Sequence, residues 1–189
     1  ICPTLVAGKI GNGFHFDGTE RFDVADDANE FDTAGFTVAT WVNFETMTFE
    51  GNSFACPTGK VEDATIYNTW ELCFDNGSGG SWLYDTTQVN AVGFASFDEL
   101  HEVPPPTTGI WYHTAMTWDG HVKTLWLNGQ NVASEPNVSV VFEPGGAVTF
   151  GADTDNGGQQ SSPFVGIMDD LRIYDHALAA DEIAALAAH

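Results

Sequence analysis

The chain has 189 residues, of which 43% are hydrophobic and 13% aromatic, so it can form one packed domain and is not a disordered polypeptide. Its 27 Asp and Glu residues against 5 Lys and Arg give a formal net charge of -22. This charge excludes binding to nucleic acid or anionic membranes, since both need clustered cations, and no apolar run approaches the ~20 residues of a membrane-spanning helix.

Short β-type runs separated by turn residues make up most of the sequence. In chain order they are GFHFDG (13–18), FTVATWVNF (36–44), WELCF (70–74), SWLYD (81–85), WYHTAMTW (111–118), VKTLWLNG (122–129), VSVVF (138–142), AVTFG (147–151) and FVGIMDDLRIY (164–174). Many short strands with turns every 8 to 12 residues predict an all-β sandwich or barrel. One helix is predicted, over AADEIAALAA (179–188), where two acidic residues fall in the first turn. We expect a single domain over residues 1–189, and the start at Ile1 rather than Met predicts a piece excised from a longer protein.

The last predicted strand carries a carboxylate where an apolar residue is expected. Strict alternation of side chains places Asp169 on one face with Val165, Ile167, Leu171 and Ile173. Four of these five side chains are strongly apolar, so the face should be buried. An unpaired charge there is very costly, so Asp169 needs a partner.

Three cysteines are present, without the spacing of a Cys or Cys/His metal site. Cys56 and Cys73 flank a stretch rich in turn and strand residues, and a disulfide between them would indicate an oxidising, exported location. The alternative is three reduced thiols in a cytoplasmic protein. We predict the Cys56–Cys73 disulfide, and leave Cys2 without an assigned partner.

Four blocks together resemble the laminin G-like domains of the concanavalin A-like lectin/glucanase superfamily. They are GKIGNGFHFDG (8–18), FTVATWVNF (36–44), GIWYHTAMTWDGHVKTLWLNGQNV (109–132) and FVGIMDDLRIYDHALAADEIAAL (164–186). The resemblance implies an antiparallel two-sheet jelly-roll sandwich, here with one short C-terminal helix. It also implies an accessory module of a larger secreted or cell-surface protein that binds glycans or proteins. The middle of the chain, about 45 to 108, matches poorly.

The same resemblance implies a structural Ca²⁺ where the last strand meets an early one. Asp17 and Asp169 would supply the carboxylates, with turn carbonyls near Gly18 completing the shell. The alternative is that Asp169 accepts backbone N–H bonds and needs no metal.

A glycan site is predicted in the divergent middle region, where aromatic rings and hydrogen-bonding groups occur together. The predicted ligand-binding residues are Trp70, Trp82 and Tyr84, with Asp153, Asp155 and Asn156 of a neighbouring loop. The alternative is that the aromatic side chains fill the core.

Catalysis is not expected, because the alternating E-x-D-x-x-E pattern of the superfamily's retaining enzymes is missing. We therefore expect a non-catalytic carbohydrate-binding module. The alternatives are a calcium-dependent protein-binding or adhesion module, and a structural spacer domain.

Overall fold

The computed structural model describes residues 2–47, 54–60, 69–75, 81–89, 95–102, 104–136, 140, 142, 146–155 and 159–189, without the side chains of residues 81, 83–89, 95–99, 101, 102 and 155. The first eight strands are β1 (Thr4–Ala7), β2 (Asn12–Asp17), β3 (Phe22–Val24), β4 (Phe36–Phe44), β5 (Phe54–Lys60), β6 (Trp70–Asp75), β7 (Ser81–Val89) and β8 (Ala95–Glu102). The remaining elements are β9 (Trp111–Trp118), β10 (Val122–Leu127), β11 (Gln130–Pro136), β12 (Val148–Phe150), β13 (Asp153–Asp155), β14 (Gln159–Ser161), β15 (Val165–Tyr174) and α1 (Ala180–Leu186).

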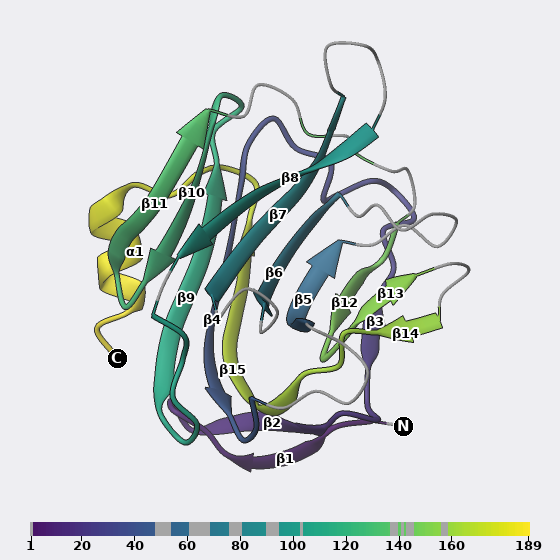
Figure 1. Cartoon of the computed structure of the whole chain (residues 1–189), viewed down its shortest axis with the longest axis vertical. Coiled ribbons are helices and arrows are strands. Elements are labelled where there is room, and N and C mark those ends of the chain that lie inside the picture. Colours follow the sequence, from purple (N-terminus) through teal and green to yellow (C-terminus); the bar gives the residue numbers. More distant parts are fainter. Residues whose placement is uncertain are drawn as a thin grey trace.

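The strands form a jelly-roll sandwich of two antiparallel sheets, as predicted. The seven-stranded sheet has the order β1-β2-β15-β4-β9-β10-β11, and the six-stranded sheet has the order β3-β12-β5-β6-β7-β8. β13 and β14 form a separate hairpin. Figure 1 shows the two sheets face to face, with α1 on the outside of the seven-stranded sheet beside β10 and β11.

Large apolar side chains fill the space between the sheets. This core includes Phe16, Phe36, Phe44, Trp70, Phe74, Trp82, Met116 and Phe164. Ring contacts join residues of the two sheets, for example Phe36 with Trp70 at 5.9 Å and Phe44 with Phe74 at 5.8 Å between centroids. Aromatic rings bury large areas and favour tilted or edge-to-face contacts, so this set accounts for much of the stabilisation of the sandwich.

The C-terminal helix covers the outer face of the seven-stranded sheet. Ile183 of α1 and Leu178 before it pack on Ala39, Ala115 and Trp126, which belong to three neighbouring strands. The helix starts where the backbone N–H of Ala179 donates to Glu182 Oε2 at 2.8 Å. Because this cover is apolar, the middle of β4 is buried on both faces rather than on one. None of the helices in the described residues is long and apolar enough to cross a membrane.

A β-bulge in β15 separates Asp169 from the apolar residues that follow it, so the predicted shared face holds for Val165 and Ile167 and is wrong for Leu171 and Ile173. The register with β4 shifts between Asp169 and Arg172, and Asp170 has a φ of 48°. A bulge inserts one extra residue and reverses the side-chain alternation beyond it. Leu171 and Ile173 therefore pack against the core between the sheets, whereas Asp169 lies on the opposite face.

The predicted disulfide is confirmed between Cys56 and Cys73, on the neighbouring strands β5 and β6. Both sulfur-bearing side chains are buried beside Phe54. Cys2 is free and exposed. The bond closes a loop with a sequence separation of 17, which in the chain-entropy picture stabilises the fold by about 3 kcal/mol.

His113 lies on the outer face of β9, paired in register with Trp41, and its imidazole is 98% buried. The two rings meet edge to face at 5.4 Å, and Nδ1 of His113 has no hydrogen-bond partner within the described part of the chain. Burial lowers the pKa of His113 from 6.5 to about 4; the charge of Asp170 opposes this shift and the charge of Arg172 adds to it. The imidazole is therefore neutral at pH 7.

This buried imidazole predicts a loss of stability in mild acid. The unfolded chain binds the His113 proton near pH 6.5 and the folded chain only near pH 4, so the free energy of unfolding falls as the pH drops across that interval. The full effect is about 3 kcal/mol. Urea denaturation between pH 4 and 7 should show a steeper fall for the wild type than for His113→Gln. His121→Gln, at an exposed histidine, is the control and should follow the wild type. Parallel profiles for the wild type and His113→Gln would contradict the prediction.

Candidate functional site

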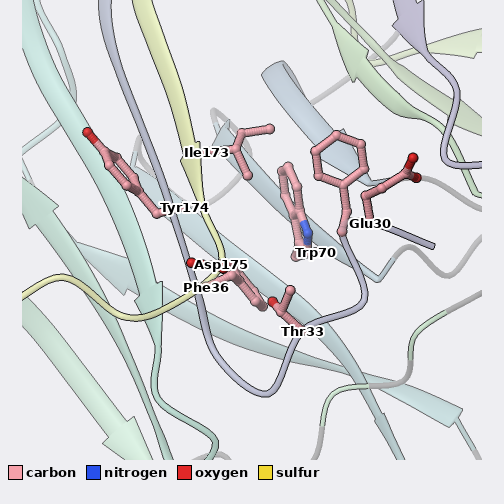
Figure 2. Close-up of a pocket in the computed structure, with 8 residues that line it drawn as sticks. Glu30, Thr33, Phe36, Trp70, Ile173, Tyr174 and Asp175 are labelled. Carbon is pink, nitrogen blue, oxygen red and sulfur yellow. The ribbon is translucent and has the colours of Figure 1, made fainter. Parts of the chain in front are cut away.

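A cavity of about 300 Å³ opens at one end of the sandwich. Its walls come from three segments that are far apart in the sequence: the loop that leads into β4, the first residue of β6 and the end of β15. The lining residues are Glu30, Phe31, Thr33, Phe36, Trp70, Ile173, Tyr174 and Asp175. In Figure 2, Phe36, Trp70 and Ile173 gather around the cavity, whereas the Tyr174 side chain points away from them.

The inner walls of the cavity are apolar. Phe36 and Trp70 are core residues with 2% and 1% of their surface exposed, so only their margins reach the cavity. Phe31 and Ile173 are half-buried and pack on the same core. A site of this kind receives the apolar side of a small ligand and excludes water from it.

The rim of the cavity carries hydrogen-bond acceptors. Glu30 and Asp175 are exposed, and the side chain of Asp175 is 82% accessible. Glu30 Oε2 also accepts a long hydrogen bond of 3.3 Å from Ala28 N. Thr33 Oγ1 donates its proton to the carbonyl of Gly35 at 2.7 Å, so its oxygen remains as an acceptor. Among the described lining residues, none is a lysine, arginine or histidine.

The loop that carries Glu30 and Phe31 is held by a buried ion pair. Lys60 Nζ lies 2.6 Å from Asp26 Oδ2, and both side chains are fully buried. The ammonium group also contacts Asp32 Oδ1 at 3.4 Å and donates to the carbonyl of Gly146 at 2.8 Å. Asp26 Oδ1 accepts from the backbone N–H of Phe31 at 3.3 Å, so the pair fixes the wall of the cavity directly.

Asp26 remains charged despite its burial. Burial alone would raise the pKa of Asp26, but the hydrogen bonds from Lys60 and Phe31 and the charge of Lys60 outweigh it and hold that pKa below the usual value. At the rim, the hydrogen bond with His176, at 2.8 Å, and the charge of that ring hold the pKa of Asp175 below its usual range. Both carboxylates are ionised at neutral pH.

The predicted stacking of a sugar on Trp70 and Trp82 is wrong, although the margin of Trp70 does line the cavity. Trp70 and Trp82 are buried to 99% and 98%, so neither offers a ring face on which a sugar could stack. Trp82 packs edge to face against Phe44 and Tyr112. Large apolar rings on strands that face the second sheet are more stable in the core than in water, so both indole rings are buried and do not form a binding surface. Tyr84 lies in register with Leu72 and Leu100, but its side chain falls outside the described residues.

Of the predicted ligand-binding residues Asp153, Asp155 and Asn156, only the side chain of Asp153 is described, and it has a structural role. Asp153 is buried and joins the two strands of the β13–β14 hairpin: its Oδ1 accepts from Thr154 N and its Oδ2 from Ser161 Oγ. The side chain of Asp155 and all of Asn156 lie outside the described residues.

The predicted pair of calcium ligands, Asp17 and Asp169, does not come together. Asp17 is paired in register with Val165, four residues before Asp169, which places the two about 13 Å apart along the strand. Ca²⁺ binds its ligands at 2.3–2.6 Å, so one ion cannot contact both carboxylates.

Each oxygen of Asp169 already accepts a backbone hydrogen bond. Ile10 N donates to Oδ2 at 2.6 Å, and Asp170 N donates to Oδ1 at 2.7 Å. A Cβ at Gly8 would collide with Oδ2, so a glycine is required there for the close approach. Two backbone N–H groups thus satisfy the carboxylate of Asp169, as the alternative to a metal requires.

Exposed Asp17 closes a local turn, accepting from both the backbone N–H and the hydroxyl of Thr19. Within the described part of the chain, Cys56, Glu71 and Cys73 form the one close group of metal-binding residue types, and the disulfide removes both thiolates from it.

Several cavity residues carry no signal that sequence reasoning could use. Glu30 and Phe31 belong to an acidic loop whose sequence is typical of a solvated surface. Ile173 and Asp175 lie at a strand end whose sequence indicates only a structural role. Only the three-dimensional fold brings these segments together. The acidic loop just before a buried strand is the one feature that sequence analysis could have used.

A family model for the concanavalin A-like lectin/glucanases superfamily, of laminin G type, matches residues 16–184. The chain belongs to this superfamily. The resemblance inferred from the sequence is thereby confirmed, and the jelly-roll architecture described above is the one that superfamily members share.

Three similar proteins illustrate the range of these modules. Sushi, von Willebrand factor type A, EGF and pentraxin domain-containing protein 1 from Rattus norvegicus is 29% identical over 97 residues, which are 48% of this chain and 3% of that protein. Domain 4 of AbnA, a GH43 extracellular arabinanase from Geobacillus stearothermophilus solved with arabinotriose, is 20% identical with a TM-score of 0.63, covering 99% of this chain and 82% of that one. The CBM40 of the Ruminococcus gnavus IT-sialidase, solved with α2,3 sialyllactose, is 14% identical with a TM-score of 0.72, covering 93% and 96%.

The two structural likenesses show the fold of this chain and nothing more specific. The chain spans about 3% of the length of the curated relatives it matches, so the functions of those whole proteins do not transfer to it.

Replacing Lys60 alone should destabilise the fold much more than replacing Lys60 and Asp26 together. Lys60→Met should lower the free energy of unfolding by about 3–5 kcal/mol, because it leaves Asp26 charged and buried without its counter-ion. The double variant Lys60→Met with Asp26→Leu should recover much of that loss, since both charges are gone. Arg21→Met, which breaks the more exposed pair with Asp23, is the control and should cost at most about 1 kcal/mol. Urea denaturation measures all three; equal losses in Lys60→Met and Arg21→Met would be inconsistent with this account.

Asp169→Asn should destabilise the fold to the same extent with and without calcium. The amide keeps one acceptor oxygen, so one of the two backbone N–H groups loses its carboxylate partner, at a cost of about 1.5–3 kcal/mol. Asp17→Asn is the matched control and should change stability little, because the residue is exposed and its Oδ1 can be retained. Thermal melts in Ca²⁺ and in EDTA test both variants. A calcium-dependent stabilisation that vanishes in Asp169→Asn would show that a metal acts there.

Proposed function

We propose that this chain is a non-catalytic glycan-binding module, and that the cavity lined by Phe31, Phe36, Trp70 and Ile173 receives a sugar unit. The observation that supports this most strongly is the combination of apolar walls with the acceptors of Glu30, Thr33 and Asp175 at the rim. A sugar ring has an apolar C–H face and a margin of hydroxyl donors, which is the complementary arrangement. The solved domains bound to arabinotriose and sialyllactose have the same architecture and support carbohydrate as the ligand class.

The distribution of positive charge favours a glycan without acidic groups. All five lysines and arginines lie in the described part of the chain. Four of them meet carboxylates, in the pairs Arg21–Asp23, Lys60–Asp26, Lys123–Glu135 and Arg172–Asp170. The fifth, Lys9, lies over the ring of Trp41 at 4.6 Å. A sialylated ligand would therefore find no lysine or arginine at the cavity, and the net charge of -22 would repel it.

The chemistry of the rim supports binding rather than hydrolysis. A glycosidase needs one carboxylic acid whose pKa is raised so that it can protonate the leaving oxygen. At this rim the pKa of Asp175 is lowered instead, by its hydrogen bond with His176. The disulfide further supports a module that works outside the cytoplasm, on a secreted or cell-surface protein. The structural calcium expected from the sequence stays a prediction, without Asp17 and Asp169 as a shared pair of ligands.

An alternative function is protein binding at the free edge of the seven-stranded sheet. Leu5 of β1 and Phe14 of β2 are paired in register and are 63% and 42% exposed. Exposed apolar pairs on an edge strand are suited to contact with another polypeptide. The relative that carries Sushi, von Willebrand factor type A, EGF and pentraxin domains is consistent with this role.

Affinity electrophoresis against neutral and cationic polysaccharides tests the proposed function. We expect retardation without cleavage, with a Kd between about 1 μM and 1 mM. Thr33→Tyr should fill the cavity and abolish retardation, and Glu30→Ala, a smaller change at an exposed position, should weaken it. Leu5→Ser is the control and should bind glycan as the wild type does, because it lies on β1, outside the cavity lining. Loss of binding in Leu5→Ser, with Glu30→Ala unaffected, would move the site to the edge strand and refute the proposal.

A further inference from the structure

We propose that the cavity selects an amino sugar whose amine is free and protonated, as in a deacetylated hexosamine oligomer. This inference rests on the proposed function and specifies the class of sugar. It follows from the hydrogen-bonding state of each polar group at the rim and from the charge that surrounds the cavity.

The polar side chains at the exposed rim, Glu30, Thr33 and Asp175, act as acceptors. The two donors among the lining side chains are the indole N–H of Trp70, which is 1% exposed, and the hydroxyl of Tyr174, whose side chain points away (Figure 2). Glu30 and Asp175 are carboxylates, and the Thr33 hydroxyl has already given its proton to Gly35. An N-acetyl group would present a carbonyl oxygen that finds no side-chain donor here. An ammonium group presents three N–H donors and a charge, and a charge-assisted hydrogen bond to a carboxylate is about twice as strong as a neutral one.

The surroundings of the cavity carry carboxylates, and the basic side chains beside them, Lys60 and His176, are already paired with those carboxylates. The nearest buried cation, Lys60, is already engaged by Asp26, by Asp32 and by the Gly146 carbonyl. Asp175 interacts with His176 through Oδ1, while its side chain stays 82% accessible. The apolar walls of Phe36 and Ile173 exclude water from one side of the bound group, and this strengthens its attraction to the rim carboxylates.

Isothermal titration calorimetry with short oligosaccharides of equal length tests this selectivity. The probes are the β1,4-linked trimers of glucosamine, N-acetylglucosamine and glucose, with trilysine as a cation that is not a sugar. At low ionic strength the glucosamine trimer should bind at least ten times more tightly than the other two trimers and more tightly than trilysine. In Glu30→Gln with Asp175→Asn, the three sugar trimers should bind alike, within about threefold.

A matched charge control separates recognition at the cavity from general attraction to an acidic protein. Glu45→Gln also removes a negative charge, but Glu45 follows the opposite end of β4 from Phe36, about 30 Å away by strand rise. It should leave the preference for glucosamine unchanged. If Glu45→Gln weakens glucosamine binding as much as Glu30→Gln does, or if trilysine binds as tightly, the attraction is unspecific and the inference is wrong.

The same titrations distinguish this inference from the proposed function. Equal binding of all three trimers, reduced by Thr33→Tyr, would overturn the preference for an amine and leave the glycan-binding function standing. Absence of binding by any trimer, together with no retardation in any polysaccharide gel, would overturn both.

Discussion

The buried contact between Lys60 and Asp26 is the constraint on which the candidate site depends. A lysine at the end of β5 has no exposed surface, so its ammonium group needs partners inside the protein. Those partners are the carboxylates of the loop that leads into β4 and a carbonyl before β12. One charged group thus fixes a segment that apolar packing alone would leave free. Phe31 and Glu30 take their positions from that fixation, through the bond from Phe31 N to Asp26.

The second requirement is the bulge in β15. Without the extra residue at Asp169–Asp170, strict alternation would turn Ile173 outward, away from the core and the cavity. With it, Asp169 stays on the outer face and binds the chain that joins β1 to β2, while Ile173 turns inward. The bulge positions Ile173 and the ion pair positions Phe31, and both side chains line the cavity. The cavity lies where β4 and β6 begin and β15 ends, which is at one end of the sandwich.

The sequence alone predicts the architecture well and the site poorly, and the reason lies in the range of the interactions. Strand segments such as FTVATWVNF are marked by local composition, and the four family-like blocks carry the topology. The helix over 179–188 was placed within two residues at each end, and the disulfide was found. The face shared by Asp169 with Leu171 and Ile173 was wrong because a bulge is a one-residue departure from alternation, and the positive φ that marks it is at Asp170, which is not a glycine.

The predictions of the glycan-binding and calcium-binding residues were wrong for a related reason. Trp70 and Trp82 look the same in sequence whether they line a surface or fill a core, and only the position of the second sheet decides between these roles. The calcium pair failed because a register difference of four residues leaves two carboxylates of adjoining strands too far apart to share an ion. The cavity joins residues 30, 70 and 173, separations over which no local pattern carries information.

The use of every lysine and arginine in an internal contact affects how copies of the module approach one another. Four of these cations meet carboxylates and the fifth lies over an indole ring, so the solvent side of the protein carries almost one sign of charge. Two molecules of the protein would therefore repel each other at distances up to the screening length, about 8 Å at physiological ionic strength. This repulsion keeps the molecules apart in solution, and it weakens as the salinity of the medium rises and the screening length shrinks.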